Sequence, residues 1–195
     1  MRYKLEEMAE LDNKTEISSA FNNLPDEWIV LAETSAEKTL GNSLSMIKHL
    51  VYDKGYVGIV VSASRPYNNL MNLYQQKGID TDKIFFIDCI SKSQSVDLTE
   101  GGNVVYQDSV SDLTNISLSI KKSLDMISVK KFVFIDSITT MLIHNSSEIF
   151  ARFIHGMLTK FRMMGVSGLL ISVENETDDH VISQISNLSD KVIKI

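Results

Sequence analysis

The stretch Lys131-Phe-Val-Phe-Ile-Asp-Ser137 decides the fold. Its unbroken run of aromatic and β-branched residues predicts a short strand that is covered on both faces, as in a parallel sheet. The run ends in a carboxylate, Asp136, and a hydroxyl, Ser137. Open α/β sheets bind their ligands at the carboxyl ends of the strands, so these two residues are candidates for a functional site.

Similar runs recur along the chain and alternate with helical periodicity. Strands are predicted at 28–33, 57–62, 84–90, 103–106, 132–136, 168–173 and 191–195. Apolar residues at helical spacing predict helices at 43–54, 67–77, 112–127 and 147–164. Strand–helix–strand alternation with short connections predicts an open, doubly wound α/β sheet whose strands are mostly parallel.

The first 27 residues have a different character. They are polar, and we expect an N-terminal helical extension over residues 1–27 that docks through Ile17, Phe21 and Leu24. Residues 28–195 are expected to form a single domain, because a chain of 195 residues suits one core and its two prolines leave no room for a flexible linker.

Composition excludes several classes of protein. The formal net charge of −6 argues against a protein that coats duplex DNA, where Lys and Arg contacts to phosphate dominate the affinity. Cys89 is the only cysteine, so an internal disulfide is impossible, and its apolar surroundings predict an inert core thiol. The polar N-terminus and the absence of a long apolar run predict a cytoplasmic protein with no membrane span.

Four segments, taken in order, resemble the RecA-like ATPases of the KaiC, FlaH, GvpD and RadA group. Phe132-Val-Phe-Ile-Asp-Ser-Ile-Thr139 is similar to the Walker B strand, which holds Mg²⁺ in these enzymes. The closing segment 188–195, the segment 54–62, and the pieces Thr15-Glu-Ile17 and Leu24-Pro25 resemble further parts of the family pattern. The resemblance implies a RecA-like, P-loop NTPase-type three-layer sandwich with a mostly parallel central sheet, and a site for ATP and Mg²⁺.

The phosphate-binding loop of that family, Gly-x-x-x-x-Gly-Lys-Ser/Thr, has no match here. It should lie within 32–44, where backbone N–H groups freed by glycines would converge on phosphate. When the family pattern is aligned without gaps between Glu33 and Gly55, its two glycines, its lysine and its Ser/Thr fall on Thr34, Thr39, Leu40 and Gly41. Moving the frame two residues upstream recovers Lys38-Thr39 but replaces both glycines by Ala32 and Glu37. Moving it two residues downstream recovers Gly41 and Ser43 but replaces the lysine by Asn42.

A second catalytic element of the family is also missing. The family carries a Glu just beyond its second strand to activate the attacking water, and here that position reads Ser62-Ala-Ser-Arg-Pro66. The sequence therefore predicts a KaiC-like pseudo-ATPase, not expected to hydrolyse ATP or to need a cofactor. It would act as a regulatory or assembly protein whose partner is a second copy or a related KaiC-like ATPase.

Two other functions stay open. The chain could bind ATP and Mg²⁺ as an ATPase or switch through a variant loop, with candidate site residues Lys38, Thr39, Ser43, Asp136 and Ser137. It could also be a recombinase-like nucleic-acid accessory protein, which the acidic charge disfavours.

Further residues have a functional and a structural interpretation. Asp136 could hold a metal ion or cap the next segment, and Arg65 could bind an anion or a neighbouring subunit or be a plain loop residue. The acidic stretch 174–180 could bind a divalent metal, but a solvated loop that ends in a helix cap is favoured.

Overall fold

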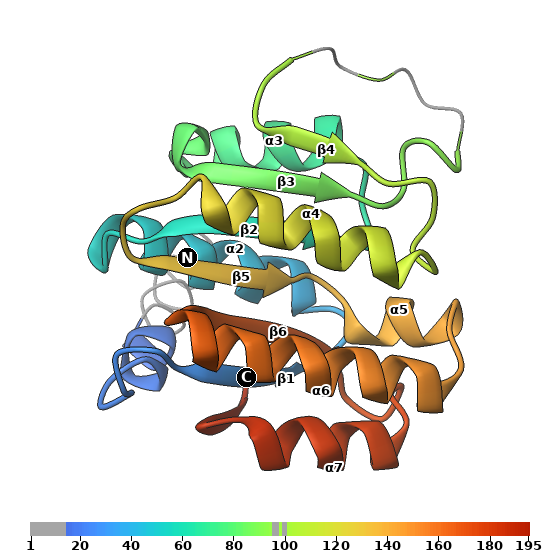
Figure 1. The fold of residues 1–195 in the computed structure, drawn as a ribbon. Coiled ribbons are helices and arrows are strands. Elements are labelled where there is room, and N and C mark those ends of the chain that lie inside the picture. The colour runs from blue at the N-terminus through green and yellow to red at the C-terminus, as the bar shows by residue number, and fades with distance from the viewer. Residues whose placement is uncertain (1–14, 95–97, 99–100) are drawn as a thin grey trace.

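Seven parallel strands form one sheet among the residues that the computed structural model describes, which are 15–94, 98 and 101–195. Their order across the sheet is β4-β3-β2-β5-β6-β1-β7, and every pairing between neighbours is parallel (Figure 1). The strands are β1 Ile29–Thr34, β2 Val57–Ser62, β3 Ile84–Asp88, β4 Val104–Tyr106, β5 Lys131–Ile135, β6 Ser167–Val173 and β7 Lys191–Lys194.

Helices connect the strands. They are α2 Thr39–Lys48, which continues into a π-helical turn His49–Asp53, then α3 Tyr67–Gln76, a 3₁₀ turn Thr81–Lys83, α4 Leu113–Asp125, α5 Ile138–Ile143, α6 Ser147–Met164 and α7 Asp179–Leu188. The left-handed backbone of Gly165 (φ 65°) ends α6, a conformation that glycine adopts without steric cost.

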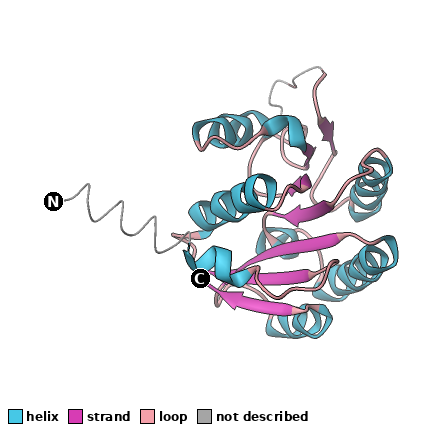
Figure 2. Cartoon of the chain, turned by 90° about the vertical axis from the view of Figure 1, so that its left-hand side faces the viewer, coloured by secondary structure: helices cyan, strands magenta, loops and turns pink. Residues whose placement is uncertain are grey.

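The sheet is covered on both faces, so the architecture is the expected three-layer sandwich (Figure 2). Alternation along β5 shows how the layers are built, because successive strand side chains point to opposite faces. Val133 and Ile135 pack with α4, α5, α6 and α7, whereas Phe132 and Phe134 pack with α2 and α3. Both sets of side chains are almost completely buried, which explains the continuous apolar pattern of this strand.

The described part of the N-terminal extension packs on the α2–α3 face. Residues 15–20 are helical, and Ile17 and Phe21 are buried in the core on that side. The Phe21 ring contacts the Trp28 ring edge-on at 5.2 Å between centroids, and the Trp28 indole N–H donates to the Tyr56 hydroxyl at 3.2 Å. Residues 1–14 of the expected extension lie outside the described residues, and a domain boundary at residue 27 stays a prediction.

The structure confirms most of the predicted elements. All seven strands were predicted, with ends within two residues of the observed ones, and Cys89 is buried as expected. The prediction of a helix at 43–54 was wrong at its start, because α2 begins four residues earlier at Thr39 and leaves only residues 35–38 to connect it to β1. The short helix α5 was not predicted, and α7 was expected only as a helix that follows a cap within 174–180. No helix in the described ranges has the length and apolar character that crossing a bilayer requires.

Candidate functional site

The carboxyl ends of β5, β2 and β3 meet at one edge of the sheet, where two buried aspartates lie on either side of β2. Asp136 follows β5, and Asp88 is the last residue of β3. They are 8 % and 0 % exposed, respectively. A buried carboxylate is costly unless donors surround it, so the hydrogen bonds of these two residues define what this edge can do.

Both oxygens of Asp136 accept hydrogen bonds from the loop between β2 and α3. Oδ1 accepts from the Ala63 N–H at 2.8 Å. Oδ2 accepts from the Ser62 hydroxyl at 3.0 Å, the Ser64 hydroxyl at 2.6 Å and the Ser64 N–H at 3.3 Å. Burial raises the pKa of Asp136 above its ordinary value, and the hydrogen bonds from Ser64, Ala63 and Ser62 oppose that rise. The carboxylate therefore fastens the β2–α3 loop to β5.

Ser137, the other residue of the strand tip, caps α5. Its hydroxyl oxygen accepts from the Thr140 N–H at 3.0 Å and lies 2.8 Å from the Thr140 hydroxyl. A serine at this position satisfies one of the N–H groups that a helix start leaves without a partner. The capping role that the sequence suggested for Asp136 thus belongs to its neighbour.

Asp88 binds the other end of the same loop. One oxygen accepts from the Tyr67 N–H at 2.7 Å, at the start of α3, and from the Ser91 hydroxyl at 2.5 Å. The other accepts from the N–H groups of Ile90 at 2.7 Å and Ser91 at 2.9 Å. Sequence reasoning missed this residue. The signal was an aspartate at the end of a buried apolar strand, the same feature that singled out Asp136.

The connection between β1 and α2 is a closed turn. The N–H groups of Lys38 and Thr39 both donate to the Ser35 carbonyl, at 3.0 and 3.1 Å, and the Thr39 hydroxyl donates to the same oxygen at 2.9 Å. A phosphate-binding loop needs such N–H groups to point outward at the ligand. Here they are used within the turn.

Asn42, which takes the position of the phosphate-binding lysine in the alignment shifted two residues downstream, is held by a hydrogen bond as well. The Asn42 side-chain amide donates to the Thr34 hydroxyl at 3.1 Å, which ties α2 to the end of β1. The side chain of Lys38 is exposed and does not line the cavity at this edge.

A small cavity of about 220 Å³ lies where these elements meet. It brings together four of the five predicted site residues, namely Thr39, Ser43, Asp136 and Ser137, and Arg65 also lines it. Apolar side chains, including Tyr74 and Phe134, fill out the rest of its wall. Pockets for drug-sized ligands measure about 300–1,000 Å³, so this one is below the usual range.

The acidic stretch 174–180 is a helix cap, as the sequence favoured. One Asp178 oxygen accepts from the N–H groups of His180 at 2.9 Å and Val181 at 3.2 Å, and the other accepts from the Ser147 hydroxyl at 3.0 Å. These contacts lower the pKa of Asp178, and the hydrogen bond from the Val181 N–H has the largest effect. Within the described part of the chain, no three His, Cys, Asp or Glu side chains are grouped as a metal site.

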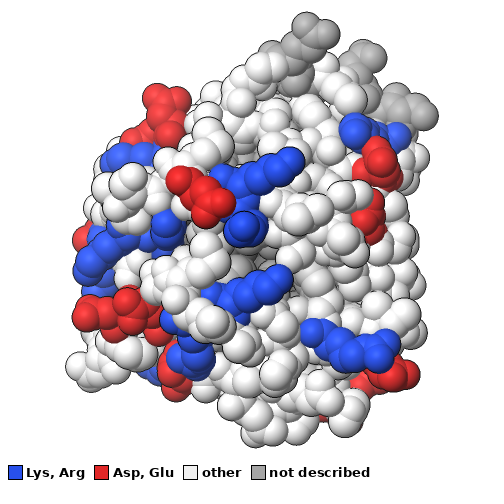
Figure 3. Space-filling model, viewed as in Figure 1, with Lys and Arg blue, Asp and Glu red and all other residues white. Residues whose placement is uncertain are grey.

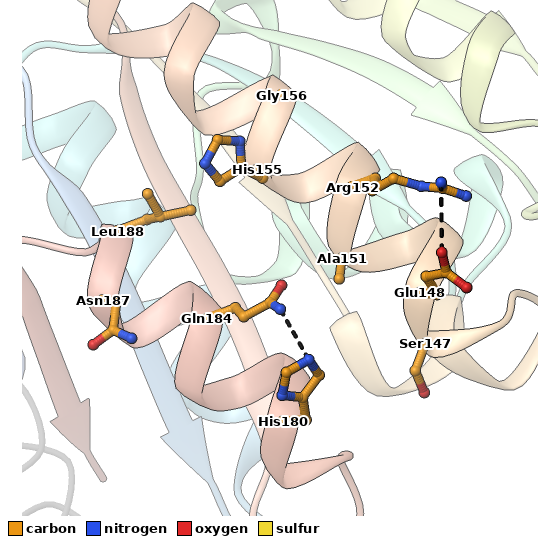
Figure 4. Close-up of a pocket in the computed structure, with 10 residues that line it drawn as sticks. All are labelled: Ser147, Glu148, Ala151, Arg152, His155, Gly156, His180, Gln184, Asn187 and Leu188. Atoms are coloured by element: carbon orange, nitrogen blue, oxygen red, sulfur yellow. Dashed lines mark hydrogen bonds and ion pairs between the residues drawn. The ribbon is translucent and has the colours of Figure 1, made fainter.

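A wider hollow of about 790 Å³ lies on the outer surface between α6 and α7 (Figure 4). Each helix carries one pair of polar side chains that contact each other here. His180 contacts Gln184 at 2.9 Å, and Arg152 contacts Glu148 at 3.5 Å. Neither buried aspartate lines it, so it is separate from the site at the strand ends.

Comparison with known proteins places this geometry in a family. The family model for the KaiC ATPase matches residues 34–195. The chain belongs to the KaiC ATPase family. The matched region includes the closed turn at 35–38, both buried aspartates and the cavity beside them.

Solved structures agree with that fold. A KaiC-like protein from the hyperthermophilic archaeon Pyrococcus horikoshii OT3 is similar with a TM-score of 0.63 and 16 % identity, over 88 % of this chain and 72 % of that one. An uncharacterized P. horikoshii protein, solved in complex with an unknown peptide, is similar with a TM-score of 0.69 and 12 % identity, over 92 % of this chain and 82 % of that one. No curated protein matches the chain in sequence.

Proposed function

We propose that this KaiC-family domain is a pseudo-ATPase that acts as a regulatory or assembly protein through protein–protein contacts. The observation that carries the proposal is the closed turn between β1 and α2. The N–H groups of Lys38 and Thr39 donate to the Ser35 carbonyl, so they do not converge on a phosphate position. The stretch 32–40 contains no glycine that would allow another loop geometry.

The Asp136 carboxylate supports the same proposal. A Walker B aspartate acts by holding Mg²⁺ next to the nucleotide phosphates. Both oxygens of Asp136 already accept hydrogen bonds from residues 62–64, and a metal ion would have to displace those donors from a buried site. The residues present do not fit a Mg²⁺–triphosphate group, and we derive no hydrolytic step for this chain.

The strength of hydrogen bonds to charged groups indicates how much nucleotide affinity such a loop would lose. A hydrogen bond to a charged group contributes roughly 1.5–3 kcal/mol. Losing two of them weakens nucleotide binding by about 10²–10⁴-fold, at about 1.4 kcal/mol for each factor of ten. Such a loss would turn micromolar affinity into one too weak to matter at cellular nucleotide concentrations.

The proposed partner is a second copy of this chain or a related KaiC-like ATPase, in the cytoplasm. The single buried cysteine and the acidic net charge of −6 suit a reducing compartment and disfavour nucleic acid. The P. horikoshii protein of similar fold was solved with a peptide, and a peptide or protein ligand is in keeping with the proposal.

Isothermal titration of the full chain with MgATP and MgADP tests the proposal. We expect no saturable heat up to millimolar nucleotide. Cooperative unfolding of the same preparation serves as the control that the protein is folded. Saturable binding in the micromolar range would contradict the pseudo-ATPase proposal.

One observation favours the second candidate, a nucleotide-binding ATPase or switch with a variant loop. Thr39, Ser43, Asp136 and Ser137 share one cavity, so their oxygens could act together on a ligand. Saturable binding that is lost in Ser43→Ala would support this alternative, because Ser43 lines the cavity without making any of the loop-fastening bonds of Asp136.

A further inference from the structure

A groove runs between α4 and α6 on the outer face of the molecule. It consists of two adjoining hollows of about 400 and 470 Å³ that share Ser117, Leu118, Met157 and Lys160. Figure 3 shows this face, on which Lys and Arg side chains project over a largely uncharged surface. The groove lies on the side of the sheet opposite to α2 and α3.

The walls of the groove expose large apolar side chains. Leu118, Ile149 and Met164 are 50 %, 51 % and 39 % exposed, and Phe153 is half-buried beside them. A contiguous apolar surface with a polar rim marks an interaction site more often than a plain surface. Met157 and Met164 add flexible side chains that adapt to an incoming surface.

The charged residues that line the two hollows are all basic. Lys121, Lys160 and Arg152 line the two hollows, and no Asp or Glu does. Arg152 pairs with Glu148 at 3.5 Å, whereas no ion pair among the described residues includes Lys121 or Lys160. This surface is therefore locally basic on a chain whose net charge is −6.

The basic rim restricts what can bind. Two copies that met through this same face would bring Lys121 and Lys160 of one against those of the other, and like charges repel. An occupant that fits carries acidic side chains and an apolar stripe, as an amphipathic helix does when it lies in a groove between two helices.

The chain contains one such segment. Residues 5–12 read Leu-Glu-Glu-Met-Ala-Glu-Leu-Asp, with four carboxylates and no basic residue. Leu5, Met8 and Leu11 recur at a spacing of three, which gathers them on one side of a helix. This segment lies outside the residues that the structure describes.

The point where that segment joins the described chain favours a second copy as the receiver. Residues 15–20 pack on the α2–α3 face, across the sheet from the groove. To reach the groove of its own chain, the segment would have to pass around the sheet, whereas the groove of a neighbour has no such restriction. We propose that residues 5–12 of one copy dock, apolar side inward, in the α4–α6 groove of another copy. This inference rests on the proposed role in protein–protein contact, but not on the loss of nucleotide binding.

Sedimentation velocity of the full chain without nucleotide tests the inference, over concentrations from micromolar to hundreds of micromolar. We expect concentration-dependent self-association. Lys121→Glu with Lys160→Glu should weaken it at least about tenfold, and Glu6→Lys with Glu10→Lys should weaken it similarly, since each exchanges two favourable charge contacts for repulsion. Mixing the two doubly substituted proteins should restore association, because the exchanged charges then meet their complements.

The matched control is Lys122→Glu with Lys130→Glu, which reverses two exposed lysines outside the groove and should leave association unchanged. A chain that stays monomeric at every concentration would overturn the inference, and so would a mixture that fails to associate. Either result leaves the pseudo-ATPase proposal intact, because that proposal depends on the nucleotide titration.

Discussion

The carboxylate of Asp136 and the hydroxyl of Ser64 lie 2.6 Å apart, oxygen to oxygen, although 72 residues separate them in the chain. Through this contact the tip of β5 holds the loop that follows β2. Asp88, at the tip of β3, holds the end of the same loop through the Tyr67 N–H. The loop that bears the catalytic Glu in the family is thus fastened at both ends, and here it presents Arg65 to the cavity instead.

Removing the Asp136 carboxylate should destabilise the fold. Asp136→Ala leaves the N–H of Ala63 without an acceptor in a buried position, whereas the Ser62 hydroxyl can still donate to the Arg65 carbonyl at 2.7 Å. Because a buried group left unpaired costs about 1–3 kcal/mol, we expect the free energy of unfolding to fall by about 1–3 kcal/mol. Urea unfolding in the presence of a chelator measures this change.

The matched control for that experiment is Asp125→Ala, which removes an exposed carboxylate at the end of α4 and should change stability by less than about 0.5 kcal/mol. A carboxylate that served only to bind Mg²⁺ would cost nothing to remove from metal-free protein. Unchanged stability of Asp136→Ala would therefore contradict the fastening role.

The pH dependence of stability should carry the signature of Asp136. Burial raises its pKa in the folded state, so the folded protein binds this proton more tightly than the unfolded chain. The contribution of the group to stability is then fully present below the unfolded pKa of about 3.9 and is lost as the pH rises through the raised folded pKa.

Asp136→Asn provides the comparison, because it keeps the shape of the side chain but does not titrate. The stability of the wild type minus that of Asp136→Asn should decrease as the pH rises above about 4, and then level off. Urea midpoints of both proteins over a series of pH values measure this difference. A difference that grows with pH would mean that the hydrogen bonds from Ser64, Ala63 and Ser62 outweigh burial.

The sheet could be predicted from the sequence because its strands are covered on both faces. Continuous apolar runs such as Phe132–Ile135 have few other interpretations, and the residues after them fall at one edge whatever the strand order. The short helix α5, Ile138–Ile143, could not be predicted in this way, because six residues are too few to establish a helical period.

The site was harder to predict than the fold. Asp136 and Ser137 were identified as candidates, but their roles depend on partners that no local pattern encodes. Asp136 is satisfied by residues 62–64, whereas Ser137 binds three residues ahead, at Thr140. The missing glycines at 32–40 were visible in the sequence, but the closure of the turn onto the Ser35 carbonyl was not.

Capping of α7 by Asp178 gives a third prediction. Here stability should change with pH in the direction opposite to that expected for Asp136. Hydrogen bonds lower the pKa of Asp178 in the folded state, and the one from the Val181 N–H has the largest effect. Its charge therefore contributes stability above the unfolded pKa of about 3.9, and this contribution is lost as the pH falls through the lowered folded pKa. Asp178→Asn keeps the cap without the charge, and Asp178→Ala loses both.

At neutral pH we expect thermal midpoints in the order wild type, Asp178→Asn, Asp178→Ala. In acid, the difference between the wild type and Asp178→Asn should vanish, while Asp178→Ala stays the least stable. A gap between the wild type and Asp178→Asn that persists in acid would show that the charge is not the cause.

Two glycines make a matched pair for the last prediction. A Cβ added to Gly58, in β2, would lie 2.8 Å from the Phe132 ring and 2.9 Å from the Ile84 side chain. Neither side chain has free space to move into, since both are buried at the centre of the sheet. Gly58→Ala should therefore lower the free energy of unfolding by about 1–3 kcal/mol, as overpacking does.

Gly41→Ala should have the opposite effect. Gly41 lies in the first turn of α2, and a Cβ there would meet nothing within 4 Å. Alanine is the better helix former, so this change should stabilise the protein by about 0.5–1 kcal/mol in urea unfolding. A glycine that lets the backbone approach a phosphate does not tolerate a side chain. If Gly41→Ala instead destabilised the protein, or removed saturable heat with MgATP, then α2 would begin in a phosphate-binding loop and the pseudo-ATPase proposal would fail.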